Sequence, residues 1–563
     1  MRSHRSRWFV AVAAAFVVAG CAGVPDAGPV KVGRPIAAAG GGLADATVRE
    51  VPAGPLPGAS PVQLVSGFLR AMVDSDGGYG VARSYLVPGT TWSADSGIAV
   101  YAEPTRVVRT ARDTVVVHAS RVGVLGPRGV YRVDPGRITR RFAVARRAGD
   151  WRISKLAAGA LISSDDAGRV LQPAALYFLT PDGTRVVPEP VLESPHEPGL
   201  ATTLMRALIA GPNPMLAPGV RTAVPRGTAL VGNVPITADG VADVDLSVGT
   251  RQLTAQQLAR LSAQVVWTLR QLSSVTAVRL LANGTPLEAP GVSSLQLVSS
   301  WPEFDPDASS STRGALVVVG GRVSGLGGSV PAVLRGTRAV AANRSSDGLV
   351  AAAVRAGASG RRLLVGKVAD GHLRERLRDV SITSPAFGPR DEAMAATSSG
   401  AVYAVPATGA KRRIALAPAL RGAAIRALAV SRDGTRVALV LGAVAGNEVV
   451  LATVVRGGGR LAFRSPRVVV PASYDVSGLA WVDADELVTT VSVPGGGRGV
   501  VRVGTNGYQM HALSEVGLPS DVVAVAAAPR SRILASGRAG TWQLVGQRWH
   551  KVSSGRAPTY AGG

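Results

Sequence analysis

The residue best suited to covalent chemistry occurs once in this chain of 563 residues, as Cys21. A cysteine thiolate is the sulfur nucleophile that can accept a diacylglyceryl unit. Three arginines within the first seven residues precede an apolar run from Trp8 to Val18. This run is too short to cross a bilayer, which needs about 20 apolar residues. A basic start before a short apolar run is typical of a secretory signal peptide, so we expect residues 1–20 to be removed.

The four residues around the expected cleavage site support the same interpretation. Val18, Ala19, Gly20 and Cys21 resemble the lipobox of bacterial lipoproteins, in which signal peptidase II cleaves before the cysteine. The resemblance implies cleavage between Gly20 and Cys21, lipidation of Cys21, and anchoring at the extracytoplasmic face of the cell membrane. The alternative is a buried structural thiol in an uncleaved helix. After cleavage no disulfide could form, so the exported domains must be stable through their cores.

The other residues that could do chemistry are scattered along the chain. The six histidines, at positions 4, 118, 196, 372, 511 and 550, lack the spacing of a metal site. The densest carboxylates fall in expected turns or strand ends, and they are Asp165, Asp166, Asp243, Asp245, Asp483, Asp485 and Glu486. General acid–base chemistry needs such groups to converge in a pocket, and no P-loop or G-x-S-x-G motif occurs. We therefore predict no catalytic, cofactor-binding or metal-binding residue and a protein that is not an enzyme.

The charge of the chain is strongly positive and unevenly distributed. A formal charge of +25 would ordinarily indicate nucleic acid as a partner, but an exported protein would not meet it. Residues 313–563 carry 32 basic and 14 acidic residues, against 27 and 23 in residues 22–312. We therefore expect an anionic partner outside the cell, such as a lipid headgroup, a wall polymer or an acidic protein surface. The alternative is the ordinary solvated surface of an Arg-rich protein.

Two regions follow the signal peptide. Residues 21–60 are rich in Gly, Pro and Ala and lack periodicity, which predicts a flexible lipidated tether. Residues 61–164 should form an α+β domain whose first helix is capped by Ser60 and Gln63. A second helix near Val81–Leu86 and two alternating segments, 113–125 and 137–157, complete it. Helices followed by such a sheet resemble a nuclear-transport-factor-2-like domain. The buried face of the first helix is expected to comprise Val62, Val65, Leu69 and Met72.

A second α+β domain is predicted over residues 165–295. A strand, a Pro181-Asp182-Gly183 turn and a strand precede a helix that stops at Gly211-Pro212. A later helix is capped by Thr254 and Gln257, and Asn283-Gly284 is a hairpin signal. The order of these elements is similar to that of the GerMN domain of exported bacterial proteins. The later helix should bury Leu258, Leu261, Val265, Leu269 and Leu272.

A polar linker, residues 296–314, leads to a repeat. Apolar strand, polar turn and apolar strand recur at intervals of 46, 42, 51 and 47 residues. This period predicts an all-β propeller over residues 315–563, with a parallel solenoid as the rival. Five blades are visible, and residues 315–335 would add closing strands or a sixth blade. The turns of the repeat are anchored at Arg344, Arg390, Arg432, Asp483 and Arg530.

The order of lipobox, α+β domain, GerMN-like domain and basic propeller resembles the LpqB family of actinobacterial lipoproteins. The resemblance implies a role beside the MtrA and MtrB two-component system. There the lipoprotein binds the extracytoplasmic domain of the sensor histidine kinase and modulates its signalling, which affects envelope homeostasis and division. The alternative, from a different class, is an envelope hydrolase, a sugar-processing enzyme or a wall-polymer-binding protein built on the propeller. As an enzyme it would need carboxylates or histidines that converge at the central channel.

Overall fold

The computed structural model describes residues 52–193, 199–247, 249, 253–308, 314–529 and 532–562. The described residues all belong to one compact unit, residues 42–563. The predicted signal peptide, the lipobox residues Val18, Ala19, Gly20 and Cys21, and the tether as far as residue 51 lie outside the described residues. Among the described helices, none has the length and hydropathy needed to cross a membrane.

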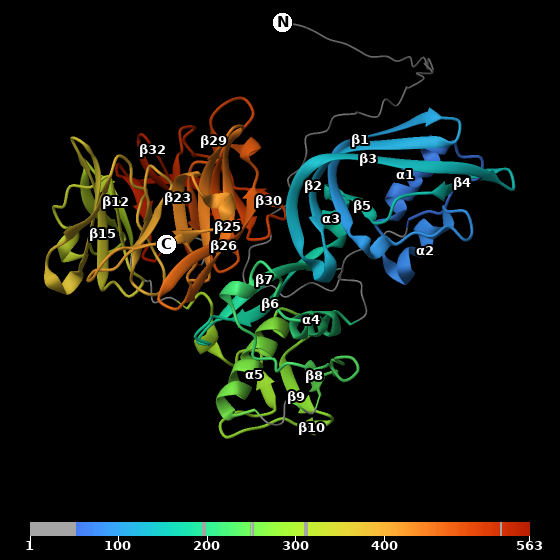
Figure 1. Ribbon diagram of the computed structural model, residues 1–563, viewed down its shortest axis with the longest axis horizontal. Helices are drawn as coiled ribbons and strands as arrows, with labels where there is room; N and C mark the ends of the chain where they lie inside the picture. The colour runs from blue at the N-terminus through green and yellow to red at the C-terminus, as the bar shows by residue number, and fades with distance from the viewer. Residues whose placement is uncertain are drawn as a thin grey trace, which may run out of the picture. The chain divides into compact units, whose positions relative to one another are not determined.

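The N-terminal domain is α+β, as predicted. Its sheet has the strand order β4-β3-β2-β1-β5, in which only β1 and β5 pair in parallel. Figure 1 shows the long strands β1, β2 and β3 curving around α1 and α2. The more specific likeness to a nuclear-transport-factor-2-like domain stays a prediction. The bounds are α1 Pro61–Ala71, α2 Asp76–Ser84, β1 Ile98–Ala111, β2 Thr114–Leu125, β3 Tyr131–Arg147, β4 Asp150–Lys155, β5 Ala160–Ser163 and α3 Ser164–Val170.

Helix α1 begins where its sequence predicts. The Ser60 side chain accepts from the Gln63 backbone N–H, and the Gln63 side chain accepts from the Ser60 backbone N–H, which completes the capping box. The buried face is wider than predicted, because Leu64 and Phe68 also lie in the core while Val62 is only half-buried. Phe68 packs edge-on against Phe142 of β3, with 5.9 Å between ring centroids. This aromatic contact holds the helix against the sheet.

The second helix lies earlier than predicted. It spans Asp76–Ser84 rather than Val81–Leu86. The residues that follow it are taken up by the sheet, because Ile153 of β4 donates to the Tyr85 carbonyl and accepts from the Val87 amide. These bonds replace the intrahelical ones that a longer helix would need.

The second domain, residues 172–297, packs two helices and two small sheets around one core. β8 runs parallel to β9, and the two-stranded sheet of β6 and β7 is separate. The capping box of Thr254 and Gln257 is confirmed at α5, and all five residues predicted for its stripe are buried. Asn283 and Gly284 both have positive φ, as a tight hairpin requires. The bounds are β6 Gln172–Leu179, β7 Val186–Glu193, α4 Leu200–Ile209, β8 Val241–Leu246, α5 Ala255–Leu269, β9 Ala277–Ala282, β10 Thr285–Pro286 and β11 Leu295–Leu297.

Polar side chains near α5 and its C-terminus bind the free edge of β6, a feature that hydrophobic periodicity does not predict. The Gln271 amide both donates to and accepts from the Ala175 backbone, at 2.7 and 2.9 Å. Gln264 donates to the Tyr177 carbonyl at 2.9 Å, and Thr268 accepts from the Tyr177 amide at 3.2 Å. The backbone of β6 is therefore satisfied without a third strand.

The predicted linker is packed along its first part. It contains β11 and the short 3-10 helix Pro302–Phe304. Phe304 is buried in a cluster with Trp267 of α5, and the Trp267 indole donates to the Trp301 carbonyl at 3.1 Å. This segment therefore reaches the propeller from a fixed point on the second domain.

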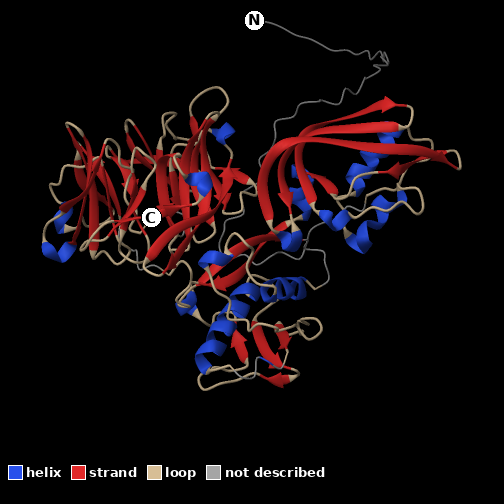
Figure 2. Cartoon of the chain, viewed as in Figure 1, coloured by secondary structure: helices blue, strands red, loops and turns tan. Residues whose placement is uncertain are grey.

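The C-terminal region is a propeller, which Figure 2 shows to be built almost wholly of strands. Within residues 314–562 six sheets are described, so the blade number is six. Blade 1 comprises β12, β13 and β35, and blades 2 to 6 follow in chain order, with β22 added in parallel to β26 of blade 4. The bounds are β12 Ala315–Val319, β13 Arg322–Leu326, β14 Ala341–Arg344, β15 Val350–Gly357, β16 Gly360–Lys367, β17 Arg374–Asp379, β18 Ala386–Phe387, β19 Ala393–Ala396, β20 Val402–Val405, β21 Arg412–Arg413, β22 Ala415–Leu416, β23 Ala424–Val430, β24 Arg436–Ala443, β25 Gly446–Gly457, β26 Arg460–Val470, β27 Leu479–Trp481, β28 Glu486–Ser492, β29 Arg498–Gly504, β30 Met510–Ala512, β31 Ala524–Ala528, β32 Arg532–Gly537, β33 Gly540–Val545, β34 Arg548–Ser553 and β35 Arg556–Thr559.

The last strand closes the ring. β35 pairs with β12, the first strand of the propeller, with Leu316 opposite Thr559, and the Thr559 hydroxyl donates to the Ala342 carbonyl of blade 2 at 2.7 Å. The six innermost strands, β35, β14, β18, β23, β27 and β31, contact one another in sequence around the ring. Closure therefore depends on a pairing between the two ends of the domain.

Candidate partner-binding face of the propeller

The propeller has two ends that are used differently. In each meander of four strands, the turns between strands one and two and between strands three and four lie at the same end. We call this the docked end, because the other two domains contact it. The hairpins between strands two and three, and the connections between blades, lie at the opposite end, which we call the free end.

A buried ion pair lies at the docked end of blade 4. Arg436 Nη2 and Asp433 Oδ2 are 3.0 Å apart, and both side chains are almost completely buried. Burial by itself would raise the pKa of Asp433, but the Arg436 guanidinium and hydrogen bonds from Thr435 and Ser431 outweigh it and lower that pKa. Asp433 is therefore held as a carboxylate.

The same guanidinium joins three parts of the chain. Arg436 Nη1 donates to the Pro188 carbonyl of β7 at 3.0 Å, and Nη2 donates to the Ala484 carbonyl of blade 5 at 2.6 Å. Beside it, the Thr453 hydroxyl donates to the Met215 carbonyl of the second domain at 2.7 Å. Blade 4 is thus bound to the second domain and to blade 5 through polar contacts.

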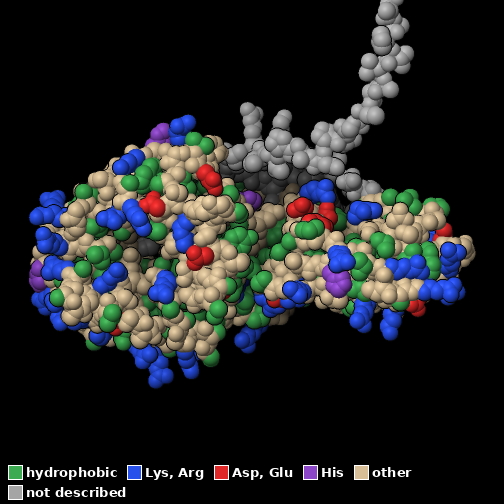
Figure 3. All heavy atoms as spheres, turned by 90° about the horizontal axis from the view of Figure 1, so that it is seen from above, with side chains coloured by type: hydrophobic (Ala, Val, Ile, Leu, Met, Phe, Trp, Pro, Cys, Tyr) green, Lys and Arg blue, Asp and Glu red, His purple; other side chains and the backbone are tan. Residues whose placement is uncertain are grey.

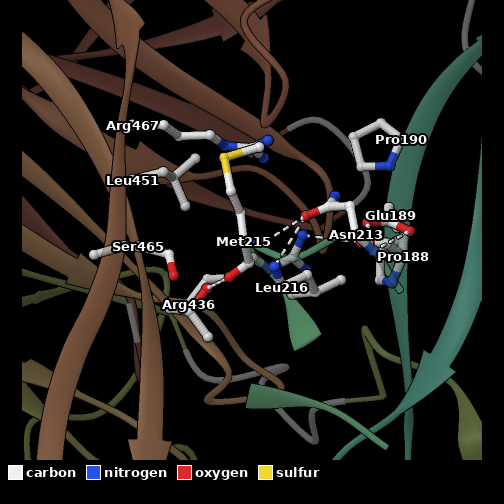
Figure 4. A pocket seen from close by; sticks show the side chains of 12 residues that line it. Pro188, Glu189, Pro190, Asn213, Met215, Leu216, Arg436, Leu451, Ser465 and Arg467 are labelled. Atoms are coloured by element: carbon white, nitrogen blue, oxygen red, sulfur yellow. Dashed lines mark hydrogen bonds between the residues drawn. The ribbon is translucent and has the colours of Figure 1, made fainter. Parts of the chain in front are cut away.

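Figure 4 shows the small pocket that remains at this contact. Its volume is about 20 Å³, which is room for about one water molecule. Glu189 accepts from the Asn213 amide at 3.0 Å, and burial raises the pKa of its carboxyl. Burial lowers the pKa of Arg467 to about 10, and nearby Arg436 acts in the same direction. The pocket is too small for an organic substrate, so we interpret it as part of the domain contact.

The N-terminal domain also reaches the docked end. Tyr508, in the turn after β29, packs edge-on against Tyr131 of β3, with 5.2 Å between ring centroids. Both rings belong to one buried cluster that also contains Leu192 of β7. This cluster therefore joins all three domains.

The anchors of the sequence repeat hold the blade turns. Arg344 is buried and donates to the carbonyls of Ser329 at 2.8 Å and Gly314 at 2.6 Å. Arg432 is buried as well, and Arg390 is exposed. Arg530 lies outside the described residues. The repeat that identifies the blades in the sequence thus marks structural positions of the docked end.

Carboxylates gather at two points of the docked end: Asp391 is hydrogen-bonded to Asp347 at one, and Asp483, Asp485 and Asp307 lie at the other. Asp483 Oδ1 accepts from the amides of Asp485 and Glu486, at 3.1 and 2.8 Å. Burial, followed by the charge of Asp485, raises the pKa of Asp483 well above its ordinary value. Burial also raises the pKa of Asp307, from the segment before the propeller, to about 6. This cluster joins that segment to blade 5.

The remaining chemical candidates have structural partners or stand apart. Asp166 is bonded to Ser163 at the start of α3, Asp243 pairs with Arg279 at 3.0 Å, and Asp245 accepts from the Gly284 amide. Among the described residues, no group of three His, Cys, Asp or Glu side chains could hold a metal ion. The innermost strands contain no His, Asp or Glu, which are the residue types that the enzyme alternative requires at the channel.

The free end combines exposed cations with exposed apolar side chains. Its apolar residues include Val380, which is 76% exposed, and Val340 and Val444, which are also exposed. Arg338, Arg355, Arg421 and Arg426 are among the exposed arginines of this end, and none of these four forms an ion pair with a described carboxylate. In Figure 3 the visible surface of the propeller carries Lys and Arg side chains interspersed with hydrophobic ones. We define the free-end patch as Arg338, Val340, Arg355, Val380, Arg421, Arg426 and Val444.

Comparisons with known proteins cover nearly all of the described chain. Three family descriptions match: "Lipoprotein LpqB, N-terminal domain" over residues 54–168, "Sporulation and spore germination" over 175–288, and "Lipoprotein LpqB beta-propeller domain" over 314–561. None of these descriptions names a catalytic activity.

Whole-length relatives carry the same name. Lipoprotein LpqB of Rhodococcus opacus is 31% identical, with 96% of this chain and 93% of that protein aligned. Lipoprotein LpqB of Thermobifida fusca is 27% identical, with 97% of each chain aligned. Among solved structures, the tandem GerMN domains of GerM from Bacillus subtilis match at 27% identity and a TM-score of 0.18, over 21% of this chain and 41% of that one.

Proposed function

Because this chain belongs to the LpqB lipoprotein family, we propose that it is a lipid-anchored, extracytoplasmic protein that binds and modulates an MtrB-like sensor histidine kinase. The names of the relatives support a lipoprotein. The identity of the partner comes from the family resemblance. The expected consequence is a change in envelope homeostasis and cell division.

The observation that carries the proposal is the division of the propeller into a docked end and a free end. Buried polar contacts at the docked end bind the chain's own domains. The free-end patch has cations without carboxylate partners beside exposed valines. Protein interfaces commonly combine apolar anchors with arginine, so this patch is the part of the propeller best suited to a partner.

Electrostatics and confinement would act together. Arginine stays charged at all physiological pH values, so the patch would orient an acidic protein surface and raise the encounter rate. Screening by salt, with a Debye length of about 10 Å at 0.1 M, would weaken the association. A lipid at Cys21 would confine both proteins to one membrane, so a weak contact would suffice.

The anchor is tested with Cys21→Ser. Acyl chains contribute about 0.8 kcal/mol per buried methylene, and two or more chains give stable anchoring. The variant should therefore appear in the soluble fraction or remain as an uncleaved precursor. Normal processing together with full membrane retention would contradict lipidation at Cys21.

The kinase role is tested in proteoliposomes that contain the purified kinase. Autophosphorylation is measured with and without the lipidated full-length protein, and binding of the kinase sensor domain is measured against salt. We expect a changed phosphorylation rate and binding that weakens with salt. An unchanged rate together with no binding at low salt would reject the proposal and favour the wall-polymer or enzyme alternative.

A further inference from the structure

The outer face of the N-terminal sheet packs against α3 at one end, through Val100, Ile162 and Ala167, and α3 does not line the groove described below. On the inner face, Val115, Val117 and Phe142 are buried against α1 and α2. Side chains alternate along a strand, and the register pairs Val116 with Arg141 and His118 with Thr139. These four residues therefore project from the opposite face.

The outer face contains a groove of about 650 Å³, a volume within the range of small-molecule sites. The groove has room because a small residue, Ala143, lies between Thr114 of β2 and Lys155 of β4 in the register of the sheet. Long side chains form its border. The lining residues are Thr110, Ala111, Thr114, Val116, His118, Thr139, Arg141, Ala143, Lys155, Leu156 and Ala157.

The charges that line the groove are all positive. Lys155 lies opposite Ala143, two residues from Arg141, so the two cations are diagonal neighbours on one face. Such neighbours lie about 7–8 Å apart, within reach of long side chains. Neither has an ion pair with a described carboxylate. Asp113 in the adjoining hairpin accepts from the Thr114 hydroxyl and does not line the groove. Two like charges without a counter-ion favour an anion between them.

We propose that this groove binds a phosphate ester, with the phosphate between Arg141 and Lys155 and the organic part over Val116 and Leu156. Guanidinium and ammonium groups form strong charge-assisted hydrogen bonds to phosphate oxygens. The Thr110 hydroxyl, at the border of the groove, can donate a further bond. The apolar floor suits a glycerol or sugar carbon skeleton rather than a bare ion.

The ligand class has two sources outside the cell, a phospholipid headgroup and a soluble or polymer-borne glycerol phosphate. Both present the same phosphate ester. The site does not depend on the kinase or on the free-end patch. Figure 3 shows Lys and Arg side chains over the visible face of the N-terminal domain, where long-range attraction would add to binding from either source.

The test is the rate at which an amine-reactive reagent labels Lys155 in the full chain. Lys367, Lys411 and Lys551 are exposed on the propeller and act as internal controls. One arm adds glycerol 3-phosphate against sodium chloride of equal ionic strength. The other adds vesicles of phosphatidylcholine with or without phosphatidylglycerol.

We expect several-fold slower labelling of Lys155 with glycerol 3-phosphate, with phosphatidylglycerol vesicles, or with both, and unchanged labelling of the three control lysines. Protection only by vesicles identifies the headgroup as the source, and protection only by the soluble ester identifies a non-lipid source. Arg141→Gln should raise the concentration for half-protection about tenfold, as for the loss of one charge-assisted contact. The matched variant Arg70→Gln, which changes an exposed residue of α1, should leave the concentration for half-protection unchanged.

Two results would overturn the proposal. One is the absence of protection in every arm. The other is equal protection by sodium chloride, which would show general screening instead of a site. Circular dichroism of Arg141→Gln checks that the sheet remains folded, and a folded variant with wild-type protection would also reject the assigned role of Arg141.

Discussion

Arginine has opposite roles at the two ends of the propeller. At the docked end, Arg436 is almost fully buried, paired with Asp433 and bonded to backbone carbonyls of two other segments. At the free end, Arg421 and Arg426 are exposed and have no described carboxylate partner. Burial of the Arg436 guanidinium has a desolvation cost, which is offset only if all of its polar contacts are kept. The exposed groups contribute little to folding and are available to another molecule.

This difference separates internal cohesion from recognition. A high net charge by itself does not show which cations bind a partner, because several arginines of the repeat hold blade turns. The exposed, unpaired cations are the subset that can act externally. We therefore expect changes at the docked end to reduce the stability of the protein more than matched changes at the free end.

The largest effect is expected from loss of ring closure. A chain that ends at Ser553 lacks β35, so β12 loses its inner partner and blade 1 can no longer close the ring. Because blades bury their faces only against neighbours, the whole propeller should lose its cooperative melting transition. Calorimetry of this chain and the full chain measures it. An unchanged propeller transition would contradict closure by β35.

The next largest effect is expected at the docked end. Arg436→Ala leaves Asp433 buried without its partner, which should cost about 3–5 kcal/mol of unfolding free energy. The matched change Arg426→Ala at the free end should cost less than about 0.5 kcal/mol. Urea denaturation monitored by tryptophan fluorescence gives both values. Similar losses in the two variants would remove the distinction between the ends.

A smaller effect is expected from the carboxyl group that joins the linker to blade 5. The pKa of Asp307 is raised from 3.8 to about 6, so the folded state binds this proton more tightly than the unfolded state. Its contribution to stability is complete below pH 3.8 and is lost as the pH rises to about 6. Asp307→Asn should therefore stabilise the protein at pH 7 by about 1–2 kcal/mol.

The same variant should flatten the dependence of unfolding free energy on pH between about 4 and 6. Thermal melts across this range measure the slope for the wild type and the variant. Asp239→Asn, at an exposed turn of the second domain, is the control and should leave the slope unchanged. Equal slopes in wild type and Asp307→Asn would show that Asp307 is not buried as described.

Local signals account for what the sequence predicts well. Ser60 with Gln63, Thr254 with Gln257, and Asn283 with Gly284 each involve residues within one turn of chain, and all three are found. The repeat likewise predicts the blades because each strand–turn–strand unit is local. The second helix differs from its predicted position because Tyr85 and Val87 bond to the backbone of Ile153, far along the chain.

What the sequence could not supply depends on distant pairings. The bond from Arg436 to Pro188 joins residues 248 positions apart, and the β12–β35 pair joins the ends of the propeller. The approach of Asp307 to Asp483 also comes from docking of the linker. The periodicity of the sequence does not predict these contacts. Neither the docked end nor the free-end patch can therefore be identified without the arrangement of the domains.

The central claim, that the free end is the partner-binding face, is tested most directly by the affinity of the full chain for the kinase sensor domain. The variant Arg421→Glu/Arg426→Glu is compared with Arg460→Glu/Arg548→Glu, which makes the same charge change at exposed turns of the docked end. We predict about tenfold or greater weakening for the free-end variant at low salt, little change for the control, and convergence at high salt. Equal weakening in both variants, or none in the free-end variant, would contradict the account.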